Sequence, residues 1–313
     1  MTFKELKNWS SISEQIDQLR GRGLDVEWDQ SEHWLRFVGY YRLSGYWHPF
    51  RVVQDDGTRS STFVTGASMK NVAELYEFDR KLKAHLLSGL ERVEVACRSR
   101  IADVLGERDV NALANPQHFR SPQLHHEMID IVDRRISRAL AAKDPVALHH
   151  RDSYDGRYPI WVAMEFLDFG DVSRLYANLM DTDREKVASW FGWVPPERHP
   201  EAKFGPAFMN WLRHLTIVRN TAAHHSRLWN RTFEPVSVKR LNMVPGLEEL
   251  RGQQDKIFGT SRVLTQLLSV TSPGTTWSSQ LVNLLEDSFQ PLDGVSWNQL
   301  GFPANWRDHF PNI

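Results

Sequence analysis

Residues 71–105 read NVAELYEFDRKLKAHLLSGLERVEVACRSRIADVL, and this stretch gives the strongest indication of the fold. Its apolar residues recur at steps of three and four, the spacing that places side chains on one face of an α-helix. The pattern predicts one long amphipathic helix with its apolar stripe against a core. The stripe consists of Leu75, Leu82, Leu86, Leu90, Val93, Cys97, Ile101 and Val104.

Similar periodicity continues toward the carboxyl end of the chain. Phe169-Gly170-Asp171 predicts a break and restart inside one of these helices, and Pro206 fits the first turn of another. After Pro273 the chain is rich in turns, but its large apolar residues predict a tail docked on the body. The predicted helices span residues 123–142, 159–180, 182–191, 206–229 and 247–268.

The amino-terminal part is also mainly helical. Ser11-Ile12-Ser13-Glu14 has the pattern of a capping box, and a second short helix is expected from near Ser31. The aromatic block Tyr40–Phe50 contains Gly45 and Pro49, which predict a helix end or a turn. Two short apolar runs, residues 52–53 and 62–64, are compatible with a small β hairpin or with an irregular arm. The expected fold class is therefore mainly α.

Charge and composition limit the partners of the chain. With 313 residues it can form one large domain or two ordinary ones, and its net charge of −1 excludes a general attraction to nucleic acid. RNA would have to meet a local basic face. Residues 202–233 contain no acid and supply such a face, although acids from neighbouring helices could pair with it. Its basic residues are Lys203, Arg213, Arg219, Arg227 and Arg231.

The only cysteine, Cys97, excludes an internal disulfide and a cysteine-type zinc site. Its place in the apolar stripe predicts burial. The chain has no recognisable secretory signal and no run of about 18 apolar residues. We therefore expect a cytoplasmic protein without a membrane partner.

Residues 219–231 read RNTAAHHSRLWNR and carry the chemistry of interest. RNA supplies its own nucleophile, the 2′-hydroxyl group. A histidine can move the proton, and an arginine can stabilise the charge that develops on the phosphate. Such a site needs no metal and no cofactor, and the lack of clustered acids argues against a two-metal nuclease. The segment indicates a candidate ribonuclease site.

Helical spacing would align most of these side chains. On a helix over 206–229, Asn220, His224, Arg227 and Arg231 follow each other at steps of four, three and four residues. They would line one stripe for as long as the helix continues, with Arg219 about 100° to one side. We expect Arg219, Asn220 and His224 to be catalytic. The expected RNA-binding residues are Arg213, His225, Arg227, Asn230 and Arg231.

Structural explanations remain open for each of these residues. An arginine followed five positions later by a histidine also arises by chance, and His225 could be a buried, hydrogen-bonded residue. The histidine pairs 125–126 and 149–150 fit packing better than metal binding, because no zinc-type spacing accompanies them. The aromatic block could stack RNA bases, although packing explains it better. Its residues in question are Tyr41, Arg42, Tyr46 and Trp47.

Several segments of the chain resemble the Abi family, the AbiD/AbiF-like abortive-infection proteins of bacteria, and they occur in the same order as in that family. The resemblance extends over nearly the whole chain and includes the motif that begins with Arg219. The matching segments are residues 40–47, 78–82, 91–96, 159–161, 169–176, 219–230 and 300–306.

The resemblance implies a HEPN-like helical bundle in which Arg219, Asn220 and His224 match a metal-independent ribonuclease motif. It further implies a homodimer, RNA as the substrate, phage defence as the role, and a possible RNA or protein antitoxin. HEPN folds also serve as binding modules, so a non-catalytic RNA- or protein-binding regulator is the alternative. A metal-dependent hydrolase is disfavoured. Residues 1–313 would form one Abi-type domain, with a helical arm (1–69), a HEPN-like core (70–232) and a docked carboxyl-terminal part (233–313).

Overall fold

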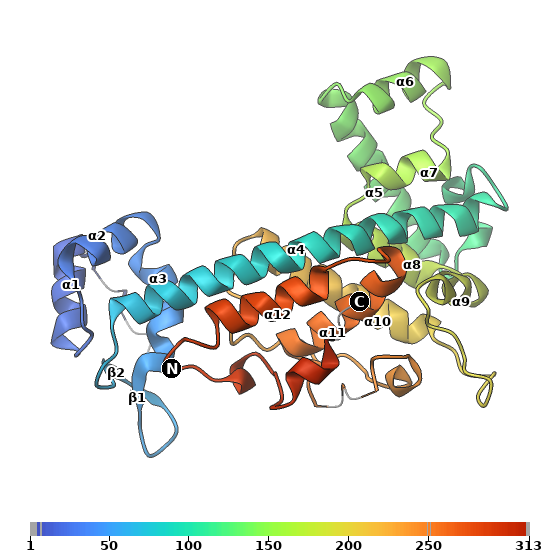
Figure 1. Cartoon of the computed structure of the whole chain (residues 1–313). Coiled ribbons are helices and arrows are strands. Elements are labelled where there is room, and N and C mark those ends of the chain that lie inside the picture. Colours follow the sequence, from blue (N-terminus) through green and yellow to red (C-terminus); the bar gives the residue numbers. More distant parts are fainter. Residues whose placement is uncertain (1–4, 7, 249, 251, 311–313) are drawn as a thin grey trace. The chain divides into compact units, whose positions relative to one another are not determined.

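The structure is a computed structural model that describes residues 5–6, 8–248, 250 and 252–310. Over these residues it is mainly α-helical with one two-stranded antiparallel sheet, which confirms the predicted fold class (Figure 1). Two compact units divide the chain. Unit 1 comprises Met1–Leu82 and Asn283–Ser296, and unit 2 comprises Lys83–Val282 and Trp297–Ile313. The division into 1–69, 70–232 and 233–313 within one Abi-type domain stays a prediction.

Helix α4, Met69–Gly106, confirms the amphipathic helix that residues 71–105 predict. Every residue of the predicted stripe is at most 1% exposed, and Cys97 is fully buried among them. Burial of about ten apolar side chains along one face stabilises the helix far more than intrinsic propensity does. The chain passes from unit 1 to unit 2 within this helix, after Leu82.

Unit 1 begins with the predicted capping box. Ser11 caps α1 (Ile12–Gly21): the Glu14 amide donates to Ser11 Oγ at 3.3 Å, and the Ser11 amide donates to Glu14 Oε2 at 2.6 Å. Helix α2, Trp28–Phe37, starts slightly before the predicted Ser31. The hairpin is confirmed by β1 (Arg51–Val53) and β2 (Arg59–Phe63), which pair antiparallel.

The aromatic block of unit 1 contains the predicted helix end, next to Pro49, but the helix does not end at Gly45. Tyr40–Trp47 forms helix α3, so Gly45 lies inside a helix where a helix end or a turn was expected. Burial explains this, because Tyr46 and Trp47 are at most 1% exposed, and the Tyr46 hydroxyl donates to buried Asp79 at 2.7 Å. Tyr41, in contrast, is 93% exposed.

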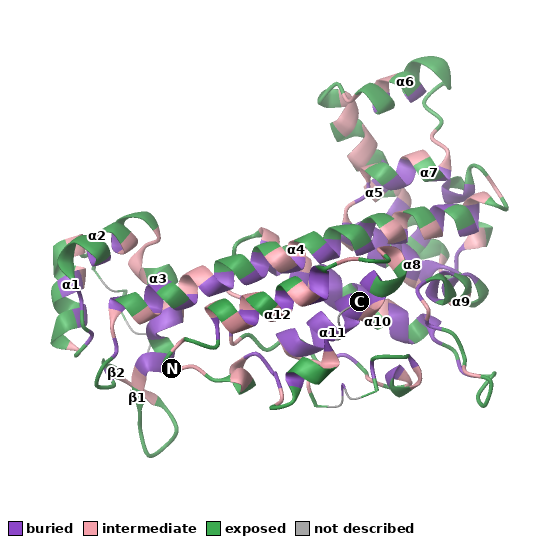
Figure 2. Ribbon diagram, in the orientation of Figure 1, coloured by how far each residue is buried: buried purple, intermediate pink, exposed green. Residues whose placement is uncertain are grey.

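The core of unit 2 surrounds α10, Gly205–Ala223, which packs against α8 (Phe169–Asn178) and α9 (Asp181–Trp190). Helix α5, Pro122–Ala141, also packs against α8. Helix α11, Ile257–Thr271, is buried along most of its length (Figure 2). The sequence motif lies at the carboxyl end of α10.

Three helical segments of unit 2 differ from the predictions. Asp144 accepts hydrogen bonds from the amides of residues 146 and 147 and caps a helix that the sequence did not indicate, α6 (Pro145–Ser153). The predicted helix 159–180 breaks before Phe169, at residues 167–168, and its first part is only α7, Ile160–Ala163. Helix α11 starts ten residues after the predicted position 247.

The short 3₁₀ helices are His48–Phe50, Ala112–Ala114, Pro116–His118, Met164–Phe166, Leu241–Met243, Trp297–Gln299 and Trp306–His309.

The carboxyl-terminal tail is docked, as predicted. Trp277, at the start of α12 (Trp277–Ser288), stacks on His85 with 4.6 Å between ring centroids, and its Nε1 donates to the His85 carbonyl at 3.0 Å. Gly89 gives this ring room, since a Cβ there would lie 2.8 Å from Trp277 Nε1. Trp306 is 1% exposed. Trp277 therefore ties the start of α12 to α4.

We expect unit 2 to lose stability in acid because of His214. The side chain is 2% exposed, and a 2.8 Å hydrogen bond joins its Nε2 to Thr260 Oγ1. Burial lowers the His214 pKa to about 4, below the value near 6.5 of an unfolded chain. The unfolded state then binds the proton more readily. The stabilisation is complete above about pH 6.5 and is lost as the pH falls toward 4.

The measurement is urea unfolding at pH 7.5 and pH 5. His214 should account for a loss of about 2 kcal/mol over this range. His214→Gln keeps a hydrogen-bonding group but does not titrate, so it should lose less stability than the wild type. Equal losses in the two proteins would show that His214 is not the group responsible.

Candidate functional site

The motif lies where α10 ends, and the backbone explains why the helix stops there. His224 is the C-cap residue of α10, and His225, which follows it, adopts a left-handed conformation with φ of 57°. The Ser226 amide bonds to the Thr221 carbonyl and the His225 amide to the Ala222 carbonyl, each at 3.0 Å. These two bonds form a Schellman motif with histidine in the place that glycine usually takes.

This ending corrects the predicted helix over 206–229. Arg227 and Arg231 follow the Schellman motif, so they do not continue a stripe that begins at Asn220. No glycine stop follows residue 223 in this segment, so the local sequence does not mark the end of the helix. Tertiary contacts select the end instead, since Leu228 and Trp229, directly after it, are fully buried.

The three predicted catalytic residues share the last turn of α10. Asn220 and His224 are exposed, and the His224 amide donates to the Asn220 carbonyl at 3.0 Å. The Arg219 side chain is 34% exposed, and its Nη1 donates to Asn220 Oδ1 at 3.2 Å. A guanidinium, an amide and an imidazole therefore sit at one helix end.

A residue that the motif does not contain anchors Arg219. Glu94 of α4 is 6% exposed, and its Oε2 lies 3.6 Å from Arg219 Nε. The other carboxylate oxygen of Glu94 pairs with Arg98, which also donates to the Leu167 carbonyl at 2.7 Å. Burial raises the pKa of Glu94, and the two arginines oppose this shift. One carboxylate thus orients Arg219 from a second helix.

By helical spacing, Glu94 lies on a charged face of the long helix, outside its apolar stripe. The available signal was its position four residues before Arg98, the spacing of a helical ion pair. That spacing predicts a surface pair and gives no indication of a third partner. Only the tertiary structure, which brings Arg219 of α10 to Glu94 of α4, reveals this contact.

Replacing Glu94 by alanine should destabilise the protein by about 3 kcal/mol. The change removes the carboxylate and leaves the charges of Arg98 and Arg219 without their common partner. Glu91→Ala, an exposed acid on the same helix, is the matched control and should change the free energy of unfolding little. Urea unfolding compares the two variants. Similar small effects in both would contradict a structural role of Glu94.

The remaining predicted RNA-binding residues lie around this helix end. Arg227 is half-buried with its guanidinium 5.8 Å from the Trp229 ring, and Arg231 lies 5.6 Å from the Phe233 ring. Asn230 is half-buried, and its backbone, like that of exposed His225, is left-handed. Each of the two arginines thus lies against a buried aromatic ring after the helix end.

Arg213 is placed on an exposed face of α10, with its Nη2 3.6 Å from Glu234. Glu94 and Glu234 therefore supply acids that the sequence segment itself lacks. The sequence left open whether acids from elsewhere in the chain pair with this basic face. Such pairing occurs at Arg219 and Arg213. Pairing of two exposed groups, as at Arg213, adds little stability and leaves the arginine available to a stronger partner.

The histidine pairs have packing contacts. His125 Nε2 lies 2.7 Å from the Leu113 carbonyl, and His150 Nδ1 lies 3.1 Å from the Arg157 carbonyl. Within the described part of the chain, no three His, Cys, Asp or Glu residues are grouped to hold a metal ion. The aromatic block belongs to unit 1, where Tyr46 and Trp47 are buried and Tyr41 and Arg42 are exposed.

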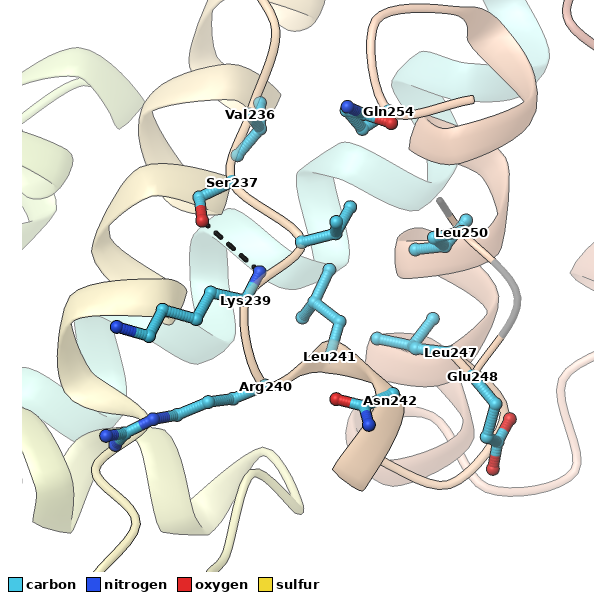
Figure 3. A pocket seen from close by; sticks show the side chains of 11 residues that line it. Val236, Ser237, Lys239, Arg240, Leu241, Asn242, Leu247, Glu248, Leu250 and Gln254 are labelled. Carbon is cyan, nitrogen blue, oxygen red and sulfur yellow. Dashed lines mark hydrogen bonds between the residues drawn. The ribbon is translucent and has the colours of Figure 1, made fainter. Parts of the chain in front are cut away.

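A separate pocket of about 780 Å³ is formed by the segment after the motif (Figure 3). Buried leucines 241, 247 and 250 line it, while Lys239 and Arg240 point away from these leucines. The Lys239 amide donates to Ser237 Oγ at 3.2 Å. None of the predicted catalytic residues lines this pocket.

The helix end and its anchoring carboxylate lie within the region that one family model matches. The family model described as "Abi-like protein" matches residues 33–230, nearly two thirds of the chain, and the chain belongs to this family. No curated protein and no solved structure matches the sequence. Membership suggests abortive-infection defence. Among the described helices, none is both long and apolar enough to cross a bilayer.

Proposed function

We propose that this Abi-like protein is a metal-independent endoribonuclease that acts in abortive infection. The observation that carries the proposal is the shared helix end, where His224 is exposed and Arg219 is anchored by Glu94. Family membership supports the defence role. The chemistry of the three side chains supports RNA as the substrate, because RNA carries the attacking hydroxyl.

In the proposed reaction the 2′-oxygen attacks the adjacent phosphorus, and the bond from phosphorus to the 5′-oxygen breaks. The products are a 2′,3′-cyclic phosphate and a 5′-hydroxyl group. His224 transfers a proton, either from the 2′-hydroxyl or to the leaving 5′-oxygen. Arg219 stabilises the negative charge on the phosphate oxygens, and Asn220, which accepts a bond from Arg219, orients the guanidinium.

A homodimer is part of this proposal. The motif supplies one clear proton-transfer residue, His224, whereas the reaction benefits from both an acid and a base. A twofold axis that brings two α10 ends together would provide a second histidine without further sequence. Because a free ribonuclease is harmful to its host, an RNA or protein antitoxin is a further proposed partner.

The decisive experiment is incubation of the purified full chain with total RNA in the presence of a metal chelator. Cleavage should persist, and mapped ends should carry cyclic phosphates and 5′-hydroxyls. His224→Ala, prepared in parallel, should leave the RNA intact. Loss of cleavage in chelator, or equal cleavage by His224→Ala, would overturn the proposal.

A non-catalytic binding regulator is the second candidate, and one contact favours it. The Arg219 Nε faces Glu94, so part of the arginine's charge is used within the protein. A binding groove needs arginines but does not need His224. RNA bound tightly by the wild type, never cut, and bound equally by His224→Ala would support this candidate.

A further inference from the structure

A groove of about 520 Å³ runs beside the motif, between α5, α8 and α10 of unit 2 (helices in Figure 1). Asn220 lines one part of it, and Met209, Arg213 and Ile217 line it further along α10. These four positions repeat at steps of three and four and therefore share one face of the helix. Between the first and last of them α10 extends about 16 Å. The groove is thus continuous with the proposed cleavage site.

Two carboxylates line the groove, and both are engaged within the protein. Arg135 of α5 donates from Nε to Asp171 Oδ2 at 2.8 Å and pairs with Asp168 through Nη2. The same two carboxylates form the capping box of α8, in which the Asp171 amide donates to Asp168 Oδ1 at 3.0 Å. Arg135 therefore offsets one of the two negative charges locally, and repulsion of a bound anion is reduced.

Two further arginines line the groove from α8 and α10 and are much more accessible. The side chains of Arg174 and Arg213 are 67% and 72% exposed. Each is 3.6 Å from its acidic neighbour, Asp171 or Glu234, which is longer than a charge-assisted hydrogen bond. Guanidinium groups on two adjacent helices can contact successive phosphates of one strand.

The lining between these arginines suits nucleotide bases. It combines the apolar side chains of Met209 and Ile217 with the polar groups of Ser173 and Asn210. Bases offer an apolar face and hydrogen-bonding edges, and a single strand exposes both. A duplex would present its phosphates and keep its bases stacked inside, so the apolar part of this surface would have no partner.

We propose that this groove binds a single-stranded RNA segment that flanks the cleaved bond, an inference that rests on the proposed function. Arg174 and Arg213 hold the phosphates, and the lining between them receives bases. The segment leaves the groove at Asn220, next to Arg219. The protein therefore selects RNA that is unpaired on one side of the cleavage position.

The test measures RNA affinity in the full chain carrying His224→Ala, so that bound RNA stays intact. Arg174→Glu combined with Arg213→Glu should weaken binding of a single-stranded oligonucleotide about tenfold or more. The slope of log affinity against log salt should fall by about 1.4, since each single-strand phosphate contact contributes about 0.7. Arg198→Glu, an exposed arginine that does not line the groove, is the matched control.

Several outcomes would overturn the inference. These are no binding of single-stranded RNA by the parent protein, an affinity of the double variant equal to that of Arg198→Glu, or equal binding of duplex and single strand. The same substitutions with His224 retained separate the inference from the proposed function. If RNA binding depends on the groove but no RNA is cut, the inference is supported and the ribonuclease proposal is refuted. If RNA is cut at the same rate with and without the two substitutions, the ribonuclease proposal is supported and the inference is refuted.

The fate of the bound RNA identifies its source. A substrate strand is cut when His224 is present. An inhibitory RNA stays intact in the groove and blocks cleavage of a second, labelled strand. Both results support single-stranded RNA as the ligand of the groove.

Discussion

Replacement of His224 by alanine is expected to abolish toxicity in cells and to slow single-turnover RNA cleavage by about 10² to 10⁴-fold, the usual contribution of a proton-transfer group. The fold should stay intact, because the His224 side chain is exposed and the helix end uses its backbone amide. Cleavage of bound RNA is measured with protein in excess, and thermal unfolding verifies the fold.

His225→Gly is the matched comparison. It removes the neighbouring imidazole, and glycine adopts the left-handed conformation of this position without strain. We expect it to retain the cleavage rate on bound RNA, even if affinity declines. Full toxicity of His224→Ala, or equal loss of rate in both variants, would assign His224 a structural role.

The second large effect is expected at Arg219. Arg219→Ala should lower the cleavage rate of bound RNA by about 10² to 10³-fold, comparable to the loss of one oxyanion-stabilising donor. Arg219→Lys should also be impaired, because an ammonium group cannot reproduce the two-pronged contact with phosphate. Its geometry relative to Glu94 would change as well, since Arg219 presents Nε to that carboxylate.

Arg227→Ala and Arg231→Ala separate turnover from binding. Both residues follow the end of α10 and lie over aromatic rings, at Trp229 and Phe233. They should weaken RNA affinity and its salt dependence while bound RNA is cut at a nearly normal rate. Single-turnover rates and affinities at several salt concentrations provide the comparison. If Arg219→Ala weakens binding but leaves the rate of bound RNA unchanged, Arg219 is only a phosphate anchor.

Local sequence determined the elements whose signals depend on near neighbours. The stripe from Leu75 to Val104 predicted α4 within two residues at each end, because helical periodicity is a property of the chain itself. The capping box at Ser11 and the small hairpin were predicted for the same reason. The residues of the motif, Arg219 through Arg231, were also recognisable without a structure.

Tertiary structure decided where the motif's helix ends and which residues meet. Burial of Leu228 and Trp229 favours an ending at His224, although His225 then takes a conformation that usually requires glycine. Burial likewise makes Tyr40–Trp47 a helix despite Gly45. Local rules cannot predict these results, because the apolar contacts that favour them come from residues distant in sequence.

The contact between Glu94 and Arg219 shows the same division. The sequence contains an acid, Glu94, four residues before Arg98, and an arginine, Arg219, at the start of the motif. These two residues are 125 positions apart in the chain. Packing of helices in unit 2 places them 3.6 Å apart and buries the carboxylate. The sequence alone determined the chemical groups of the candidate site. Their arrangement depended on the tertiary structure, because long-range packing, and not local spacing, sets the distances between charges on different helices.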